Sequence, residues 1–199
     1  MDFTNLRKTL ERLGYAVSCF AAGADAAAYL NEQIDGKTVG FGGSVTLREL
    51  GLFDSLSAHN TVNSHWNPLG GITDALREAA HTDVYLSSVN ALAETGEIIN
   101  IDGTGNRVSS MLYGHDKVYL VIGRNKIAPD YDRALWRARN IAAPKNAMRL
   151  GVKTPCAVQG DRCYNCKSPQ RICRALVVLW ECVKSCEIEI VLVDEDLGY

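Results

Sequence analysis

The sequence predicts an α/β protein built on a largely parallel, Rossmann-like sheet with helices on both faces. Short segments rich in Val, Ile and Leu alternate with amphipathic segments along most of the chain. Such alternation is typical of a parallel sheet covered on both sides. Glycine-containing turns follow several of the strand-like segments. The 199 residues, 47% of them hydrophobic, are enough for one well-buried domain.

The alternation starts with an amphipathic helix over 2–13, where apolar side chains recur at three- and four-residue steps before Gly14. The next elements are expected as a strand at 15–20, a helix at 24–34, a strand at 37–41, a helix at 46–50, a weak strand at 61–62, a helix at 71–80, a strand at 83–87, a helical turn at 90–94, a strand at 97–101, a helix at 106–113, a strand at 117–122 and a helix at 130–141.

The composition of the chain changes after Pro144, which suggests two parts. Residues 1–150 form the predicted α/β ligand-binding domain. Residues 151–199 form a Cys-rich loop and a C-terminal β-hairpin, packed on the same domain. The hairpin strands are expected at 175–181 and 187–193, and a helix over 174–184 is the alternative, because apolar runs of this length fit either structure.

The charge and hydropathy of the sequence argue against two classes of partner. The net charge is −2 and no long run has one sign, so we expect no nucleic-acid partner. No apolar run approaches the roughly 18 residues that span a bilayer, so we expect no membrane partner. Seven cysteines without an export signal favour the reducing cytoplasm. The sequence does not determine the oligomeric state, and a homodimer is one of the options.

Four of the seven cysteines lie close together in the pattern C-x6-C-x2-C-x6-C, at Cys156, Cys163, Cys166 and Cys173. The central pair can hold one ion from a single turn, and the outer two stand on loops long enough to fold back. Gly and Pro residues argue against regular structure in this segment, and a metal can fix such a loop. The spacing therefore predicts a metal or cluster bound by four thiolates.

Zinc and an iron–sulfur cluster both fit this loop. Four thiolates around Zn²⁺ or a [4Fe–4S]²⁺ core carry a net charge of about −2 in either case. Nearby basic side chains can offset that charge, at Arg162, Lys167, Arg171 and Arg174. The alternatives are free buried thiols and disulfides, and disulfides need an oxidising compartment that nothing else in the sequence supports.

Three glycine-bearing or basic loops follow predicted strands. The first contains Gly42, Gly43, Ser44 and Thr46, where glycines let a ligand approach and the hydroxyls can cap a helix or donate to an anion. It matches neither a Walker A loop nor the G-x-G-x-x-G pattern. Taken alone, this loop also fits an ordinary turn between a strand and a helix. Its place at the carboxyl end of a strand, where open α/β sheets bind ligands, favours a binding role.

The other two loops carry Asn106 with Arg107, and Asn125 with Lys126. Arginine in a first helical turn opposes the helix dipole, which an anionic partner would relieve, although a surface arginine is the simpler explanation. Convergence of the three loops would make a site for a phosphate or carboxylate. Glu94, between a strand and a glycine turn, is the candidate catalytic carboxylate, with a surface or capping role as the alternative.

Several motifs in order resemble the LUD, or lactate-utilisation, domain family. They are the segments 40–52, 87–100, 105–111, 121–127 and 193–199. The resemblance implies a fold similar to ribose-5-phosphate isomerases, CoA transferases and folate cyclo-ligases, with an anionic or acyl ligand at the glycine-rich strand ends. It also implies a role in L-lactate oxidation beside other subunits of an iron–sulfur-containing system. The cysteine loop resembles only a subset of the family.

Three hypotheses follow. The first is a protein of lactate or hydroxyacid oxidation that binds an anionic small molecule and carries a redox cluster. The second is a non-redox binding module with a structural zinc. The third is an isomerase- or transferase-like enzyme that acts on sugar phosphates or acyl-CoA through Glu94.

Overall fold

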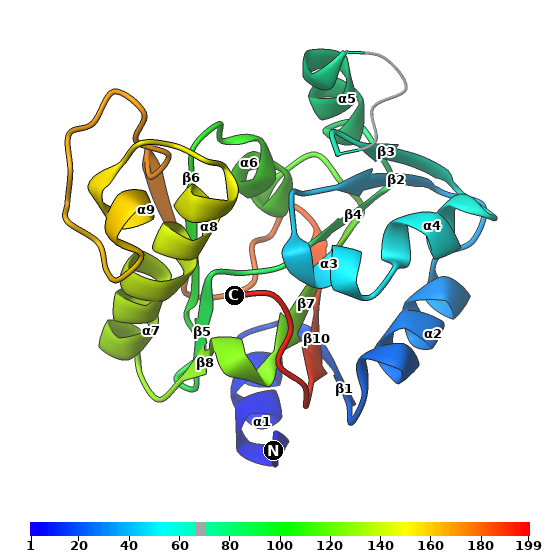
Figure 1. Ribbon diagram of the computed structural model, residues 1–199. Coiled ribbons are helices and arrows are strands. Elements are labelled where there is room, and N and C mark those ends of the chain that lie inside the picture. Colours follow the sequence, from blue (N-terminus) through cyan, green and yellow to red (C-terminus); the bar gives the residue numbers. More distant parts are fainter. Residues whose placement is uncertain (67–70) are drawn as a thin grey trace.

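The computed structural model describes residues 1–66 and 71–199, and its centre is a six-stranded sheet in which all neighbouring strands are parallel (Figure 1). In spatial order the strands are β1 (Ala16–Phe20), β10 (Glu187–Val193), β7 (Lys117–Gly123), β4 (Val84–Ser87), β2 (Thr38–Phe41) and β3 (Thr61–Ser64). The predicted α/β class with a largely parallel sheet is confirmed.

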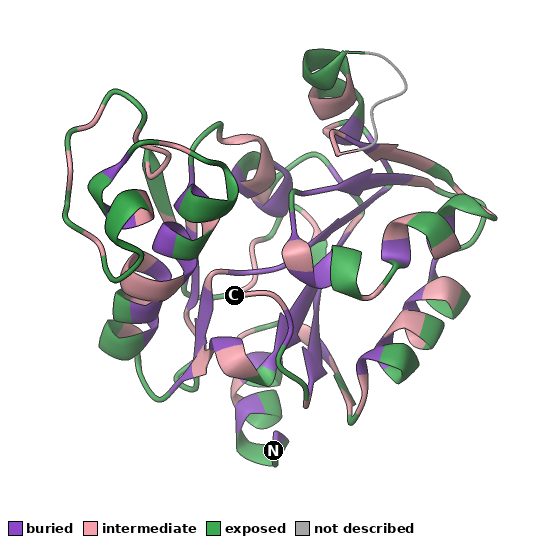
Figure 2. Ribbon diagram, in the orientation of Figure 1, coloured by how far each residue is buried: buried purple, intermediate pink, exposed green. Residues whose placement is uncertain are grey.

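Helices cover both faces of this sheet. In order they are α1 (Thr4–Arg12), α2 (Gly23–Gln33), α3 (Val45–Glu49), α4 (Leu52–Ser57), α5 (Ile72–Ala79) and α6 (Asn106–Leu112). Strand β7 shows how the two faces are filled: Val118, Leu120 and Ile122 pack with α1, whereas Tyr119 and Val121 pack with α2, α3 and α4. This period-two alternation is that of a strand buried on both sides, and the strands are the most buried part of Figure 2.

A second, smaller sheet lies beside the first. It contains β8 (Ile127–Ala128), β5 (Ala91–Ala93), β6 (Ile98–Asp102) and β9 (Ala175–Leu179), in that order. A long helical segment packs on it, made of α7 (Tyr131–Arg137), the π-helical turn η2 (Ala138–Ala142) and α8 (Ala143–Arg149). The short helix α9 (Pro155–Gln159) follows and contacts α8.

The predicted C-terminal hairpin is wrong. Strand β9 pairs with β6 in the small sheet, whereas β10 enters the large sheet between β1 and β7. Residues 151–199 therefore contribute a strand to each sheet. Apolar runs show that a segment is buried, but they do not show which strand it pairs with.

Three local expectations are also corrected. Residues 90–94 were expected as a helical turn, but β5 occupies Ala91–Ala93. The helix expected at 130–141 continues through Pro144 to Arg149, and the π-helical turn η2 directly precedes the segment that contains this proline. Cys156 lies in α9, so the cysteine loop begins with regular structure that Pro155 was expected to prevent.

The large sheet brings the carboxyl ends of its strands to one edge, because its strands are parallel. The chain leaves β2 at Gly42, β3 at His65, β4 at Ser88 and β7 at the 3-10 turn η1 (Arg124–Lys126). Helix α8 stands opposite this edge (Figure 1). Within the described residues, no helix is long and apolar enough to cross a membrane.

Candidate functional site

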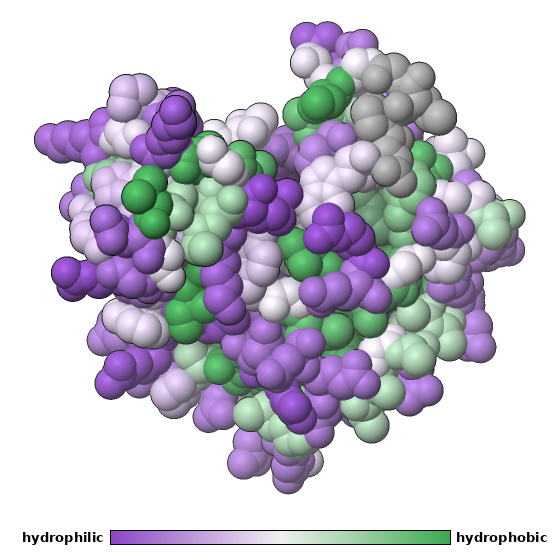
Figure 3. All heavy atoms as spheres, in the orientation of Figure 1, coloured by the Kyte–Doolittle hydropathy of each residue, from purple (hydrophilic) through white to green (hydrophobic). Residues whose placement is uncertain are grey.

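A cleft lies between the carboxyl edge of the large sheet and the part of the chain that carries α8 and the cysteine loop. It consists of two cavities of about 500 and 600 Å³ and a chamber of about 80 Å³, all three of which are lined by Trp66 and Arg149. The 600 Å³ cavity extends to Arg171 and Cys173. In Figure 3, hydrophilic residues gather between α3 and α8 on this side of the molecule.

Lys126 lies at the bottom of the small chamber and is only 4% exposed. Its Nζ donates hydrogen bonds to Thr46 Oγ1 and Ser88 Oγ, each at 2.8 Å. Among the described residues, no carboxylate comes within 4.0 Å of this nitrogen. Burial, followed by the positive charges of Arg137 and Arg107, lowers the pKa of Lys126 to about 7.

The C-terminal tail closes over this lysine. Gly198 has a φ of 60°, and a Cβ there would lie 2.7 Å from Thr46 Oγ1 and 3.3 Å from Lys126 Nζ. Thr46 Oγ1 donates to the carbonyl of Leu197. Glycine is therefore required where the tail passes the chamber.

The glycine-containing loop at 42–46 supports the fold and also lines the cleft. A Cβ on Gly42 would lie 2.8 Å from Ser87 Oγ, and one on Gly43 would lie 3.2 Å from the His65 ring. Ser44 Oγ accepts a hydrogen bond from the backbone N–H of Leu47 and so caps α3. The structure thus brings Gly42, Gly43 and Ser44 to the wall of the cleft and Thr46 directly to Lys126.

Arg107 reaches the cleft, but its donors are already engaged. Its Nε lies 3.3 Å from Asp102, and both partners are largely buried. Its terminal nitrogens donate to oxygens of Ser88, Asn90, Asn100 and Ile101. Arg107 therefore joins β6 to the loop between β4 and β5, and burial lowers the pKa of Arg107.

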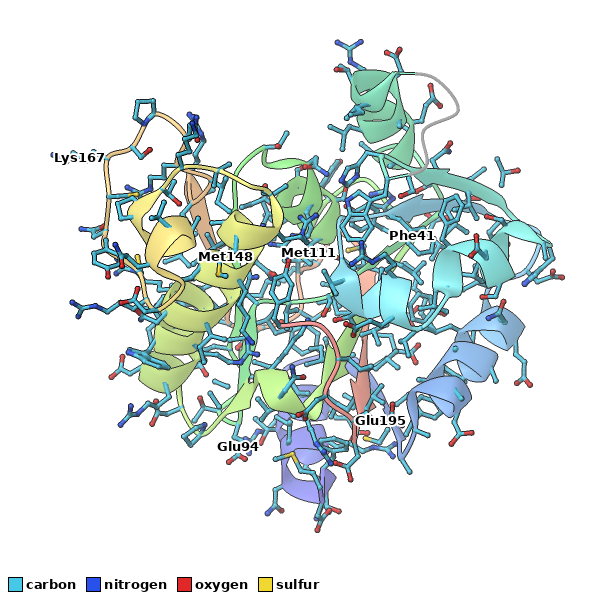
Figure 4. The ribbon with its side chains drawn as sticks, in the orientation of Figure 1. Phe41, Glu94, Met111, Met148, Lys167 and Glu195 are labelled. Carbon is cyan, nitrogen blue, oxygen red and sulfur yellow. The ribbon has the colours of Figure 1, made fainter. Side chains whose placement is uncertain are left out.

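The remaining predicted residues lie in different places. Asn106 lines the 600 Å³ cavity. The side chain of Asn125 accepts from the N–H of Leu197 and donates to the carbonyl of Gly198, so it holds the tail in place. Glu94 is exposed in the turn after β5, near α1 and away from Phe41 and Met148 beside the cleft (Figure 4). The structure does not bring Glu94 to the cleft.

Several cleft residues were not among the candidates. Arg149 Nε donates to Asn146 and Tyr199, and the guanidinium of Arg149 lies 5.3 Å from the centroid of the Trp66 ring. Burial, followed by the charge of Arg149, lowers the pKa of His65. His65 and Trp66 follow β3 directly, which is a usable signal, whereas nothing in the sequence connects Arg149 of α8 to this edge.

Trp136 and Arg137 are neighbours in α7 but differ in burial. Trp136 is 51% exposed, whereas Arg137 is 7% exposed. Arg137 donates to the carbonyls of Asn125 and Asn90, and so joins two of the loops that form the cleft.

The four cysteines gather at one end of the cleft. Burial, followed by the neighbouring thiols of Cys163, Cys156 and Cys166, raises the pKa of Cys173 to about 11. The backbone N–H of Asn165 donates to Cys163 Sγ at 3.3 Å, and Asn165 has a left-handed φ of 47°. Asn165 thus forms a tight turn between Cys163 and Cys166.

Two arginines lie among these cysteines. Arg139 reaches Cys163 Sγ at 3.9 Å, and Arg171 donates to the carbonyls of Cys166 and Cys173. The four side chains are free thiols. Within the described residues, no three His, Cys, Asp or Glu side chains are placed as ligands of one metal ion. Four cysteines are a chemically suitable donor set for a metal bound by thiolates, and such a metal stays a prediction.

The fold and the site define an α/β protein with a ligand cleft at the carboxyl edge of a parallel sheet. The LUD domain family matches residues 4–193, so the chain belongs to the LUD-domain family. A DUF162 family protein from Deinococcus radiodurans has a similar crystal structure, with a TM-score of 0.55 and 14% identity over 95% of this chain and 94% of that one. At this identity the likeness shows the fold alone. No curated protein matches the sequence.

Family membership confirms the resemblance found in the sequence motifs. The family is named for lactate utilisation, and the chain is accordingly related to that process.

Proposed function

We propose that this protein binds a small 2-hydroxy or 2-oxo carboxylic acid in the chamber above Lys126 and serves as a component of hydroxyacid oxidation. The observation that supports it most strongly is the buried amine of Lys126, which has two hydroxyl partners and, among the described residues, no carboxylate. The C2 oxygen of a bound acid would supply a third partner for this amine.

The size and charge of the cleft support a small anion. A cavity needs roughly 10–15 Å³ to hold one water molecule, so a chamber of about 80 Å³ has room for a few non-hydrogen atoms. Arg149 stands at its wall and lacks an ion-pair partner among the described residues, whereas Arg107 is paired with Asp102. The carboxylate of the ligand would lie toward Arg149, and its C2 oxygen toward Lys126.

An iron–sulfur cluster in the cysteine loop would bring electron transfer close to this cleft. Cys173 and Arg171 line the same 600 Å³ cavity as Asn90, which also lines the chamber. Cys156, Cys163, Cys166 and Cys173 would hold an iron–sulfur cluster or zinc. An iron–sulfur cluster would supply electron transfer, and zinc would supply a structural staple. Other subunits of a lactate-oxidising system would exchange electrons with the cluster.

Calorimetric titration with L-lactate and with lactamide, its neutral amide, tests the proposal. We expect heat from lactate and none from lactamide, because the cleft selects the negative charge. Replacing Arg149 by Met should weaken lactate binding by about five-fold, the size expected for an exposed ion pair. Arg77→Met, on exposed α5 and outside the cleft, is the matched control. Equal binding of lactate and lactamide would contradict the proposal.

A further inference from the structure

The buried amine of Lys126 lines the chamber and has two hydrogen-bond partners among the described residues. An ammonium has three N–H donors, whereas a neutral amine has two donors and one lone pair. The described residues offer Lys126 two acceptors, Thr46 Oγ1 and Ser88 Oγ. A neutral amine satisfies both of its donors there, and its lone pair is left for the chamber. An ammonium would keep one donor and a full charge without a partner.

The charges around Lys126 favour the same form. Arg137 from the α7 segment and Arg107 from α6 repel an ammonium, and burial adds to their effect. Glu49 of α3 acts in the opposite direction, but its Oε2 accepts a 2.6 Å hydrogen bond from the N–H of Gly198. The resulting pKa of about 7 leaves a large share of unprotonated amine near neutral pH. Desolvation beside other cations is a known way to activate a lysine.

We infer that Lys126 captures a 2-oxo acid as an imine in the chamber between Thr46 and Ser88, an inference that rests on the proposed function. Oxidation of a 2-hydroxy acid produces a carbonyl at C2, which is the electrophile that an amine attacks. The Nζ lone pair forms a bond to C2, and the carbonyl oxygen takes up the two amine protons and leaves as water. No oxidant or reductant is consumed. The hydroxyls of Thr46 and Ser88 hold Nζ in position.

Reductive trapping tests the imine. The full-length protein is incubated with pyruvate and sodium borohydride, and the product is examined by intact mass and peptide mapping. We expect one reduced adduct per chain, on Lys126, and none with L-lactate, which has no carbonyl. Lys126→Met and Lys126→Arg should both lose the adduct. Exposed Lys167, at the outer edge of the cysteine loop (Figure 4), is the internal control.

The rate of trapping should rise with pH through about 7, because the reactive form of Lys126 is the unprotonated amine. Adduct spread over surface lysines such as Lys167, or adduct retained in Lys126→Arg, would overturn the inference. Lactate binding without any pyruvate adduct would also overturn it and leave the proposed function intact. If neither lactate nor pyruvate binds, both fail.

Discussion

Protein purified without oxygen is expected to contain a metal, and Cys166→Ser is expected to lose it. With an iron–sulfur cluster the parent protein is brown, and the variant is colourless. With zinc the parent is colourless and binds one ion per chain. Metal binding by thiolates stabilises zinc-finger peptides by about 10–16 kcal/mol, so loss of the metal should leave residues 155–174 unfolded. Elemental analysis, the visible spectrum and hydrogen exchange measure these effects.

Cys19→Ser is the matched control for this experiment, since Cys19 is exposed on β1 and outside the cysteine loop. It should keep the full metal content. The large sheet should stay folded in Cys166→Ser, because its buried clusters do not include the loop. A parent protein that is free of iron and zinc after anaerobic purification would contradict the metal proposal and leave the cleft proposal untouched.

Arg107→Met is expected to destabilise the protein by about 3–5 kcal/mol, because it leaves Asp102 buried without its ion pair. It also removes donors from the oxygens of Asn90 and Asn100. Urea unfolding at neutral pH measures the change. The double variant Asp102→Asn with Arg107→Met should recover part of the loss, because the unpaired charge is gone.

One result would contradict the structural role of Arg107. A variant as stable as the parent but unable to bind lactate would make Arg107 a ligand contact instead of a scaffold. The five engaged donors of its guanidinium argue for the scaffold.

The large sheet could be predicted from the sequence because its strands carry strong local signals. Strand β7 is apolar on both faces, and turns with glycine follow β2 and β6. The position of β10 between β1 and β7 could not be predicted, because strand pairing depends on contacts between distant segments. Strand β5 has only three residues, too few to show a period of two.

Part of the candidate site could also be predicted from the sequence, because some of its residues directly follow strands. Ser44, Thr46 and Lys126 follow strands of the parallel sheet, and parallel strands bring such residues to one edge. Arg149 comes from α8, and the sequence predicted neither this helix nor the second sheet. The polar contacts of Asn125 and Arg107 also depend on partners elsewhere in the chain, Leu197 and Ser88 among them.

Titration of Lys126→Met with L-lactate tests the central claim most directly. We expect the variant to fold, because a buried amine is replaced by an apolar side chain. We also expect lactate affinity to fall about ten-fold or more, because a buried polar partner of the ligand is lost. Unchanged lactate affinity in a folded Lys126→Met would contradict the claim that an acid binds above this lysine.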